Sequence, residues 1–165
     1  MSTDAPVFRT ATDEDREAIR RFHALTELWP DGEGELSREF AADDVKYVDH
    51  WSAEDDGAII AEIAGEIAGG AWLRHFTADD PGSGYVSDDV PEVAIAFEPA
   101  FTGRGLGKQL MAKVLDFARD RGAPAVSLTV DMGNERACRS YLGVGFEFTE
   151  GAVDVEGYRT MIHRF

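Results

Sequence analysis

Segment 102–108 of this 165-residue chain combines glycine with basic side chains, a combination suited to binding phosphate. It reads Thr-Gly-Arg-Gly-Leu-Gly-Lys, and it lies between an apolar run at 93–97 and apolar residues at helical spacing from Leu106 onward. Alternate glycines let the backbone approach a ligand, and the free N–H groups at a helix N-terminus attract anions. The segment therefore predicts a phosphate or pyrophosphate site, with a plain glycine turn as the alternative.

Two well-known phosphate loops do not fit this segment. A P-loop requires glycine where this chain has Thr102, and Ser or Thr where it has Gln109. A dinucleotide-binding fingerprint requires two residues between its second and third glycines, whereas only Leu106 separates Gly105 from Gly107. The spacing therefore points to a different kind of phosphate loop.

The distribution of charge also points to an anionic ligand. The chain has 16 Lys and Arg against 32 Asp and Glu, which gives a formal net charge of −16. Even so, window 103–115 has no acidic residue and holds Arg104, Lys108 and Lys113. In so acidic a chain, this basic island favours a phosphate-bearing molecule as the ligand.

A second pattern follows a predicted strand later in the chain. Segment 134–146 opens on Asn134, which is a good helix N-cap, and carries Tyr141 about two helical turns further along the same face. It ends with Gly145 and Phe146. Together, the two segments resemble the acetyl-CoA loop and the second signature of the GNAT superfamily of N-acetyltransferases, in that family's order and separation.

The resemblance implies an acetyl-CoA-dependent N-acetyltransferase in which a primary amine attacks the thioester directly within a ternary complex. It implies Tyr141 as the general acid that protonates the leaving thiolate, and Glu92 as the candidate general base. Thr102 departs from the family pattern, because Arg or Gln is usual there. The residues implied to bind acetyl-CoA, the cosubstrate, are Phe97, Thr102, Gly103, Arg104, Gly105, Leu106, Gly107, Lys108 and Asn134.

Other residues fit this chemistry less well. His75 and Tyr85 are weaker candidates for the base. Cys138 has no histidine near it in the sequence, so covalent catalysis is not expected. The four histidines show no metal-ligand spacing, and no metal is expected. A non-catalytic acyl-CoA-binding sensor or regulatory module stays open as an alternative, and Thr102 favours it.

The order of predicted elements favours an α+β fold in a single domain over 1–165. The resemblance implies the GNAT fold, with a mixed, mostly antiparallel central sheet that is splayed between its two central strands and flanked by helices. The run at 93–97 is expected to be buried on both faces, and a hairpin is expected to turn at Gly65 and Glu66. The expected strands are 7–9, 58–63, 67–76, 93–97, 125–130, 146–149 and 158–163. Helices are expected after Thr12, within 36–51, from Leu106 and from Asn134.

Composition limits the partners and the location of the protein. The acidity excludes charge-driven binding to nucleic acid or to an anionic membrane surface. No apolar run has the ~18 residues of a membrane span, and residues 1–4 lack the features of an export signal. We therefore expect a cytoplasmic protein whose acceptor is a small-molecule or peptide amine. A homodimer is compatible with the family, although nothing in the sequence identifies an interface.

The acidity has a further implication for stability. Abundant Asp and Glu with only three lysines are typical of cytosolic proteins of halophilic prokaryotes. Molar salt shortens the Debye length to ~3 Å and so screens the repulsion between carboxylates. We expect the melting temperature, followed by circular dichroism, to rise between low and molar KCl. A melting temperature that KCl leaves unchanged contradicts a halophilic origin.

Overall fold

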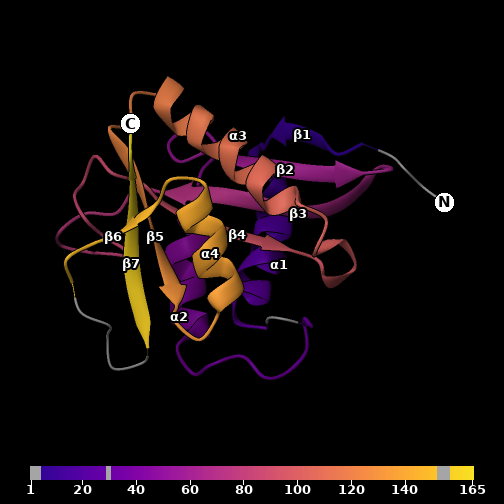
Figure 1. The fold of residues 1–165 in the computed structure, drawn as a ribbon, viewed down its shortest axis with the longest axis horizontal. Helices are drawn as coiled ribbons and strands as arrows, with labels where there is room; N and C mark the ends of the chain where they lie inside the picture. Colours follow the sequence, from indigo (N-terminus) through magenta and orange to yellow (C-terminus); the bar gives the residue numbers. More distant parts are fainter. Residues whose placement is uncertain (1–4, 29–30, 152–156) are drawn as a thin grey trace. The chain divides into compact units, whose positions relative to one another are not determined.

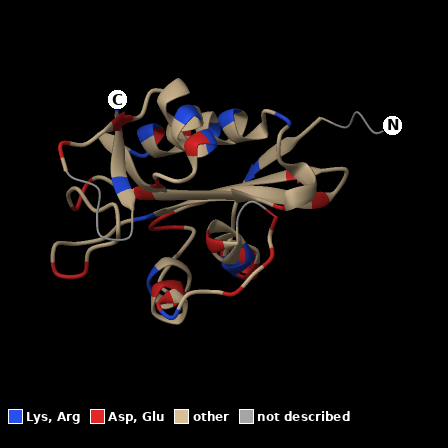
Figure 2. Ribbon diagram, turned by 60° about the horizontal axis from the view of Figure 1, so that its bottom comes forward, with Lys and Arg blue, Asp and Glu red and all other residues tan. Residues whose placement is uncertain are grey.

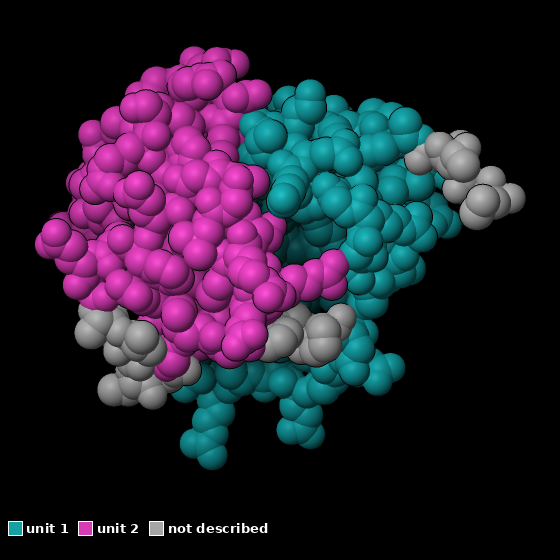
Figure 3. Space-filling view, viewed as in Figure 1, with its two compact units in different colours: residues 1–74, 94–114 teal, residues 75–93, 115–165 magenta. Residues whose placement is uncertain are grey.

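The structure is a computed structural model that describes residues 5–28, 31–151 and 157–165. Residues 1–4, on which the expectation of no export signal rests, lie outside these ranges. The chain divides into two compact units, residues 1–74 with 94–114 and residues 75–93 with 115–165 (Figure 3). Strand β4 (Glu92–Phe97) and helix α3 (Leu106–Asp120) each contribute residues to both units.

The first unit contains strands and helical segments from the first 74 residues, together with most of β4, the turn η3 and the start of α3 (Figure 1). Its complete strands are β1 (Val7–Thr10), β2 (Ala58–Ile63) and β3 (Glu66–Arg74). Its helical segments are the 3₁₀ turn η1 (Asp13–Asp15), α1 (Arg16–Glu27), α2 (Phe40–Asp44), the π-helical turn η2 (Val45–Asp49) and the 3₁₀ turn η3 (Pro99–Phe101). The last of these leads from β4 into α3.

The first helical segment begins after Thr12, as the sequence predicts, and a capping box fixes its start. The side chain of Thr12 accepts the N–H of Glu14, and the carboxylate of Asp15 accepts the N–H of Thr12 at 2.9 Å. Arg9 on β1 donates two hydrogen bonds of 2.9 Å to Asp15. This guanidinium holds the pKa of Asp15 below its usual value. The cap therefore also ties the helix to the edge strand of the sheet.

The hairpin between β2 and β3 forms one residue earlier than expected. Its two turn residues are Ala64 and Gly65, with φ of 52° and 80°, and β3 already begins at Glu66. The prediction of a turn at Gly65 and Glu66 is wrong by one position. The reason is that a tight hairpin needs two consecutive left-handed residues, and a single glycine in the sequence does not show on which side of it the second one lies.

The helices of the first unit pack closely on its sheet at Gly70 of β3. A Cβ atom at this position would lie 2.3 Å from the ring of Phe22, which is fully buried and projects from α1. Trp72, also fully buried, donates its indole N–H to the backbone oxygen of Tyr47 at 3.0 Å. The missing side chain at Gly70 therefore lets α1 approach β3, and Trp72 fixes η2 against the same strand.

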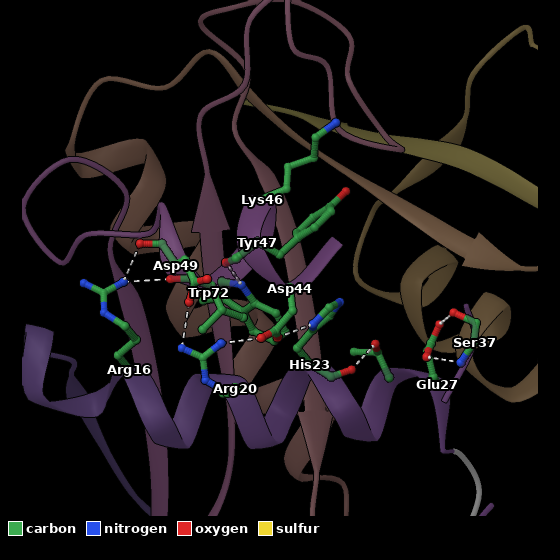
Figure 4. Close-up of polar contacts among 12 residues, drawn as sticks. Arg16, Arg20, His23, Glu27, Ser37, Asp44, Lys46, Tyr47, Asp49 and Trp72 are labelled. Atoms are coloured by element: carbon green, nitrogen blue, oxygen red, sulfur yellow. Dashed lines mark hydrogen bonds and ion pairs between the residues drawn. The ribbon is translucent and has the colours of Figure 1, made fainter. Parts of the chain in front are cut away.

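A buried polar network connects α1 with α2 and η2 in the first unit. Figure 4 shows the carboxylate of Asp44 between Arg20 and His23, both of which project from α1. The Nδ1 atom of His23 lies 2.8 Å from Asp44 Oδ1, and the imidazole stacks on Phe40 with ring centroids 4.5 Å apart. Arg20 also donates to Asp49 at 2.8 Å. The carboxylate of Asp44 thus holds α2 against α1.

The second unit is built around a three-stranded antiparallel arrangement. Strand β5 (Ala125–Asp131) pairs along its whole length with β7 (Tyr158–Arg164), which in turn pairs with β6 (Glu147–Phe148). Helix α4 (Glu135–Gly143) connects β5 to β6. The start of β4 joins this unit through a parallel pair in which Glu92 lies opposite Ser127.

The hydrogen-bonded strand order is β1-β2-β3-β4-β5-β7-β6, a seven-stranded mixed sheet. The pairs β1–β2, β2–β3, β5–β7 and β6–β7 are antiparallel and β4–β5 is parallel. With its flanking helices, this sheet confirms the predicted α+β fold class. Splaying of the two central strands stays a prediction, as does a single domain over 1–165. In the described part of the chain, no helix combines the length and apolar character of a membrane span.

The expected burial of β4 on both faces is wrong for most of the strand. Val93 is 3% exposed, but the residues after it, 94–97, are only half-buried. A continuous apolar run shows that a strand carries no polar side chains, but it does not show that other elements cover both faces. The broad helical expectation within 36–51 is confirmed in the form of α2 and η2.

The polar network of the first unit yields a stability prediction. Asp44→Ala removes the buried acceptor of both Arg20 and His23, so we expect it to lower the free energy of unfolding by about 2–4 kcal/mol. Asp49→Ala is the matched control, because Asp49 also pairs with Arg20 but is 44% exposed. The control should cost less than about 1 kcal/mol. Urea unfolding measures both, and equal losses would show that burial of Asp44 contributes nothing.

Candidate active site

The glycine loop of the first unit has the backbone that a phosphate loop requires. Turn η3 ends at Thr102, which is extended, and α3 begins at Leu106. Between them, Gly103 and Gly105 adopt left-handed conformations with φ of 76° and 75°. No atom lies within 4 Å of the position of a Cβ on Gly105, so conformation rather than space requires glycine there. These residues direct the chain into the N-terminal turn of a 15-residue helix.

The start of α3 is electrostatically suited to an anion. Asp and Glu are distributed over the helices and loops of both units (Figure 2), yet the first turn of α3 contains none. The first turns of α1, α2 and α4, in contrast, contain Glu17, Asp43 and Glu135. The unpaired N–H groups and the positive end of the helix dipole therefore act without a neighbouring carboxylate. Lys108, in the same turn, is exposed.

Two side chains of the loop are engaged with the loop itself. Thr102 donates its hydroxyl to the backbone oxygen of Pro99 at 3.0 Å. Arg104 donates to the backbone oxygen of Ala100 at 3.3 Å, and its guanidinium lies 5.4 Å from the centroid of the Phe101 ring. These contacts stabilise the turn and keep one positive charge beside it.

The apolar residues of the loop anchor it to the core of the first unit. Leu106 is 5% exposed and packs with Ile63 and Ala68, and the half-buried Phe97 and Phe101 pack against this cluster. A Cβ at Gly107 would lie 4.0 Å from the ring of Phe97, which is an ordinary contact distance. The structure therefore brings Phe97, Leu106 and Gly107 together, while their role in binding acetyl-CoA stays a prediction.

In the second unit, Glu92 is a buried carboxylate at the first position of β4. It is 5% exposed, and its Oε1 atom accepts the backbone N–H of Gly84 at 2.7 Å. The bond crosses from the loop at 75–91 to the strand. A carboxylate that is removed from water needs hydrogen-bond donors. The N–H of Gly84 therefore offsets part of the cost of burying Glu92.

The surroundings of Glu92 include residues that the sequence analysis did not single out. A Cβ on Gly82 would lie 2.3 Å from the ring of Phe76 and 2.7 Å from Glu92 Oε1. A Cβ on Gly84 would lie 2.9 Å from Thr129 Oγ1 and 3.2 Å from Glu92 Oε1. Because Gly82 and Gly84 have no side chains, the loop can lie close to the carboxylate of Glu92 and, at Gly84, to the hydroxyl of Thr129 on β5. The pair Gly82-x-Gly84 was visible in the sequence, but nothing in the sequence linked Thr129 to Glu92.

Tyr141 lies near the C-terminal end of α4, with its ring at 6.0 Å and 61° from the ring of Phe146. Burial raises the pKa of its phenol to about 12, and nearby Cys138 adds to the effect. A raised pKa means that the hydroxyl keeps its proton throughout the neutral range. The side chain can therefore donate a proton but cannot serve as a base there.

The two other residues of interest on α4 have structural partners. Asn134 caps the helix, because its Oδ1 atom accepts the N–H of Ala137 at 3.1 Å, as the sequence predicts. Cys138 is buried, and burial, followed by the charge of Asp131, raises the pKa of its thiol. A protonated, buried thiol is a poor nucleophile.

The weaker candidates occupy the loop at 75–91 or its start. His75 is exposed. Tyr85 donates its hydroxyl to Asp88, and this hydrogen bond raises the pKa of the phenol. Within the described ranges, no group of three or more His, Cys, Asp or Glu side chains is placed to hold a metal ion.

The comparison with known families decides the assignment. The family model described as "Acetyltransferase (GNAT) family" matches residues 16–146, which is most of the chain. The chain belongs to the GNAT family of acetyltransferases. A mycothiol acetyltransferase of Thermobifida fusca (strain YX) is 38% identical over 92 residues, which are 54% of this chain and 28% of that protein. This GNAT chain spans less than half the length of the curated relatives it matches.

Solved structures agree with the GNAT fold. A GCN5-related N-acetyltransferase from Kribbella flavida has a TM-score of 0.70 at 23% identity, with 98% of each chain covered. The PaiA N-acetyltransferase from Thermoplasma acidophilum, in complex with coenzyme A, has a TM-score of 0.69 at 16% identity, with 98% of this chain and 99% of that chain covered. At these identities the likeness shows the fold.

The raised pKa of Tyr141 predicts how the stability of this GNAT protein changes at alkaline pH. Above pH 10, tyrosine ionises in the unfolded chain but not at this site, so the unfolded state is stabilised relative to the folded state as pH rises toward 12. We expect Tyr141→Phe to lose less stability than the parent between pH 9 and 12, by about 1–3 kcal/mol. Urea unfolding at a series of pH values measures the difference. Parallel curves for the two proteins would show that the phenol is not desolvated.

Proposed function

We propose that this protein is an acetyl-CoA-dependent N-acetyltransferase that moves an acetyl group to a primary amine in a ternary complex. The observation that carries the proposal is the glycine loop that leads into the acid-free first turn of α3, within a GNAT family match over 16–146. In a chain with a net charge of −16, α3 is the one α-helix of the described ranges whose first turn has no acidic residue. Attraction of a phosphate-bearing molecule explains that arrangement.

The first unit supplies the proposed binding of acetyl-CoA. The backbone N–H groups over 103–108 hold the pyrophosphate, and Arg104 and Lys108 add positive charge beside it. Thr102 contributes its backbone, since its hydroxyl already bonds within the turn. The backbone of Phe97 pairs with the pantetheine arm. The family resemblance implies Asn134, the N-cap of α4, as a further contact of the cosubstrate.

The second unit supplies the proposed proton transfers. The acceptor amine attacks the thioester carbonyl carbon once it has lost a proton, so the new C–N bond forms as the C–S bond breaks. Glu92 takes the proton from the amine, directly or through water. Tyr141 gives a proton to the departing sulfur, consistent with a phenol that stays protonated up to about pH 12. Binding both substrates together provides the proximity that this direct transfer needs.

The acceptor is proposed only as a class, a small-molecule or peptide amine. Several relatives are mycothiol acetyltransferases, and a protein of similar fold is a ribosomal-protein-alanine N-acetyltransferase, which supports keeping both kinds of acceptor in the proposal. A single domain over 1–165, a cytoplasmic location, a halophilic prokaryotic source and a homodimer belong to the same proposal. Composition supports the halophilic source.

The test is an acetyl-CoA assay in molar KCl that reads the release of free CoA thiol over a panel of amines and peptides. We expect turnover with at least one primary amine. Tyr141→Phe should lower kcat by ~10²-fold while leaving acetyl-CoA binding intact, because it removes the proton donor and keeps the ring. Binding of acetyl-CoA without turnover on any acceptor would favour the non-catalytic sensor instead. An unchanged kcat in Tyr141→Phe would remove the general acid role.

A further inference from the structure

Strand β5 carries two buried hydroxyls that have no hydrogen-bond partner among the described residues. These are Ser127 Oγ and Thr129 Oγ1, and Ser127 is completely buried. Leaving a buried hydroxyl unsatisfied lowers stability, so such groups in native proteins usually bond to protein, water or a ligand. Because two such hydroxyls lie at positions 127 and 129 of the same strand, they require an explanation.

The hydroxyl of Thr129 lies near the carboxylate of Glu92, and Ser127 is the strand partner of Glu92. Residues i and i+2 of a strand project from the same face, so Ser127 and Thr129 share a face of β5. Ser127 lies directly opposite Glu92 in the parallel pair of β5 and β4. Thr129 Oγ1 and Glu92 Oε1 lie 2.9 and 3.2 Å from one point, the position that a Cβ on Gly84 would take. All four residues belong to the second unit.

This arrangement has the properties of a site for an ordered water molecule. Buried waters make two to four hydrogen bonds to polar groups that otherwise lack partners. Two hydroxyls and a carboxylate provide both donors and acceptors, and a glycine at position 84 avoids a Cβ in contact with both Thr129 Oγ1 and Glu92 Oε1. A purely structural role is a weaker explanation, because Val or Ala would pack at these two strand positions with no polar group to satisfy.

We propose that Ser127 and Thr129 are positioning residues that hold a water molecule beside Glu92, through which the acceptor amine loses its proton. The proposal rests on Glu92 as the general base in the function proposed above. The ammonium gives one proton to the water oxygen, and the water gives one of its own to the Glu92 carboxylate. The water is regenerated, Glu92 becomes protonated, and the nitrogen lone pair is free to attack the thioester.

The decisive variant is Thr129→Val, which removes the hydroxyl and keeps the shape of the side chain. We expect kcat to fall by about 10-fold or more, while the KM for acetyl-CoA stays within about twofold of the parent. Thr129→Ser restores the hydroxyl and should recover kcat to within about threefold. Thr10→Val, at an exposed threonine of β1, is the matched control for the same substitution on a strand and should behave as the parent.

Ser127→Ala provides a second variant if Thr129→Val does not fold, and it should also lower kcat with an unchanged KM for acetyl-CoA. A crystal structure of the parent should show an ordered water within hydrogen-bond distance of Thr129 Oγ1 and Glu92. A parental kcat in both hydroxyl variants, a failure of Thr129→Ser to recover activity, or the absence of that water would overturn the proposal.

Glu92→Gln separates failure of this inference from failure of the proposed base. If Glu92→Gln loses activity and the acidic limb of its kcat/KM profile while both hydroxyl variants keep parental kcat, only the role of Ser127 and Thr129 is refuted. If Glu92→Gln keeps parental activity and the acidic limb, the assignment of the base is refuted, and the inference that depends on it is refuted too.

Discussion

A buried carboxylate at the start of β4 constrains the second unit more than any other single group. Glu92 is 5% exposed, and a carboxylate removed from water must be given hydrogen-bond donors. The backbone N–H of Gly84 provides one at 2.7 Å, which requires the preceding loop to return to the strand. That return brings Gly82 and Gly84 so close to Phe76 and Glu92 that side chains at either glycine would collide. The path of the loop at 75–91, the positions of its two glycines and the burial of the Glu92 carboxylate thus depend on one another.

The first unit is governed by a different electrostatic requirement. Although the chain has twice as many acidic as basic residues, the first turn of α3 holds no carboxylate, unlike the first turns of α1, α2 and α4. The left-handed Gly103 and Gly105 direct the backbone into that helix, and Leu106 anchors it in a cluster with Ile63 and Ala68. The loop is therefore anchored in the core by Leu106, while residues 102–105 are exposed. This combination is what an anionic cosubstrate needs.

Periodicity and capping residues were sufficient to locate most helices and strands. Thr12 and Asn134 cap their helices as predicted, because a side-chain oxygen at an N-cap acts on N–H groups only two or three residues away. The register of the strands and the burial of their side chains were harder to predict from the sequence. The β2–β3 turn shifted to Ala64 and Gly65, and residues 94–97 proved half-buried. Both depend on which partners the strand meets, and a linear pattern does not contain that information.

By itself, the sequence determined the GNAT family, the α+β class, the glycine loop and the choice of Glu92 and Tyr141 as candidates. It could do so because these features are encoded by residues close together in the chain. Only the tertiary structure placed the N–H of Gly84 on the carboxylate of Glu92, raised the pKa of Tyr141 by burial, and left the hydroxyls of Ser127 and Thr129 without a hydrogen-bond partner among the described residues. Desolvation and hydrogen-bond satisfaction arise from groups distant in sequence, so they exist only once the chain has folded.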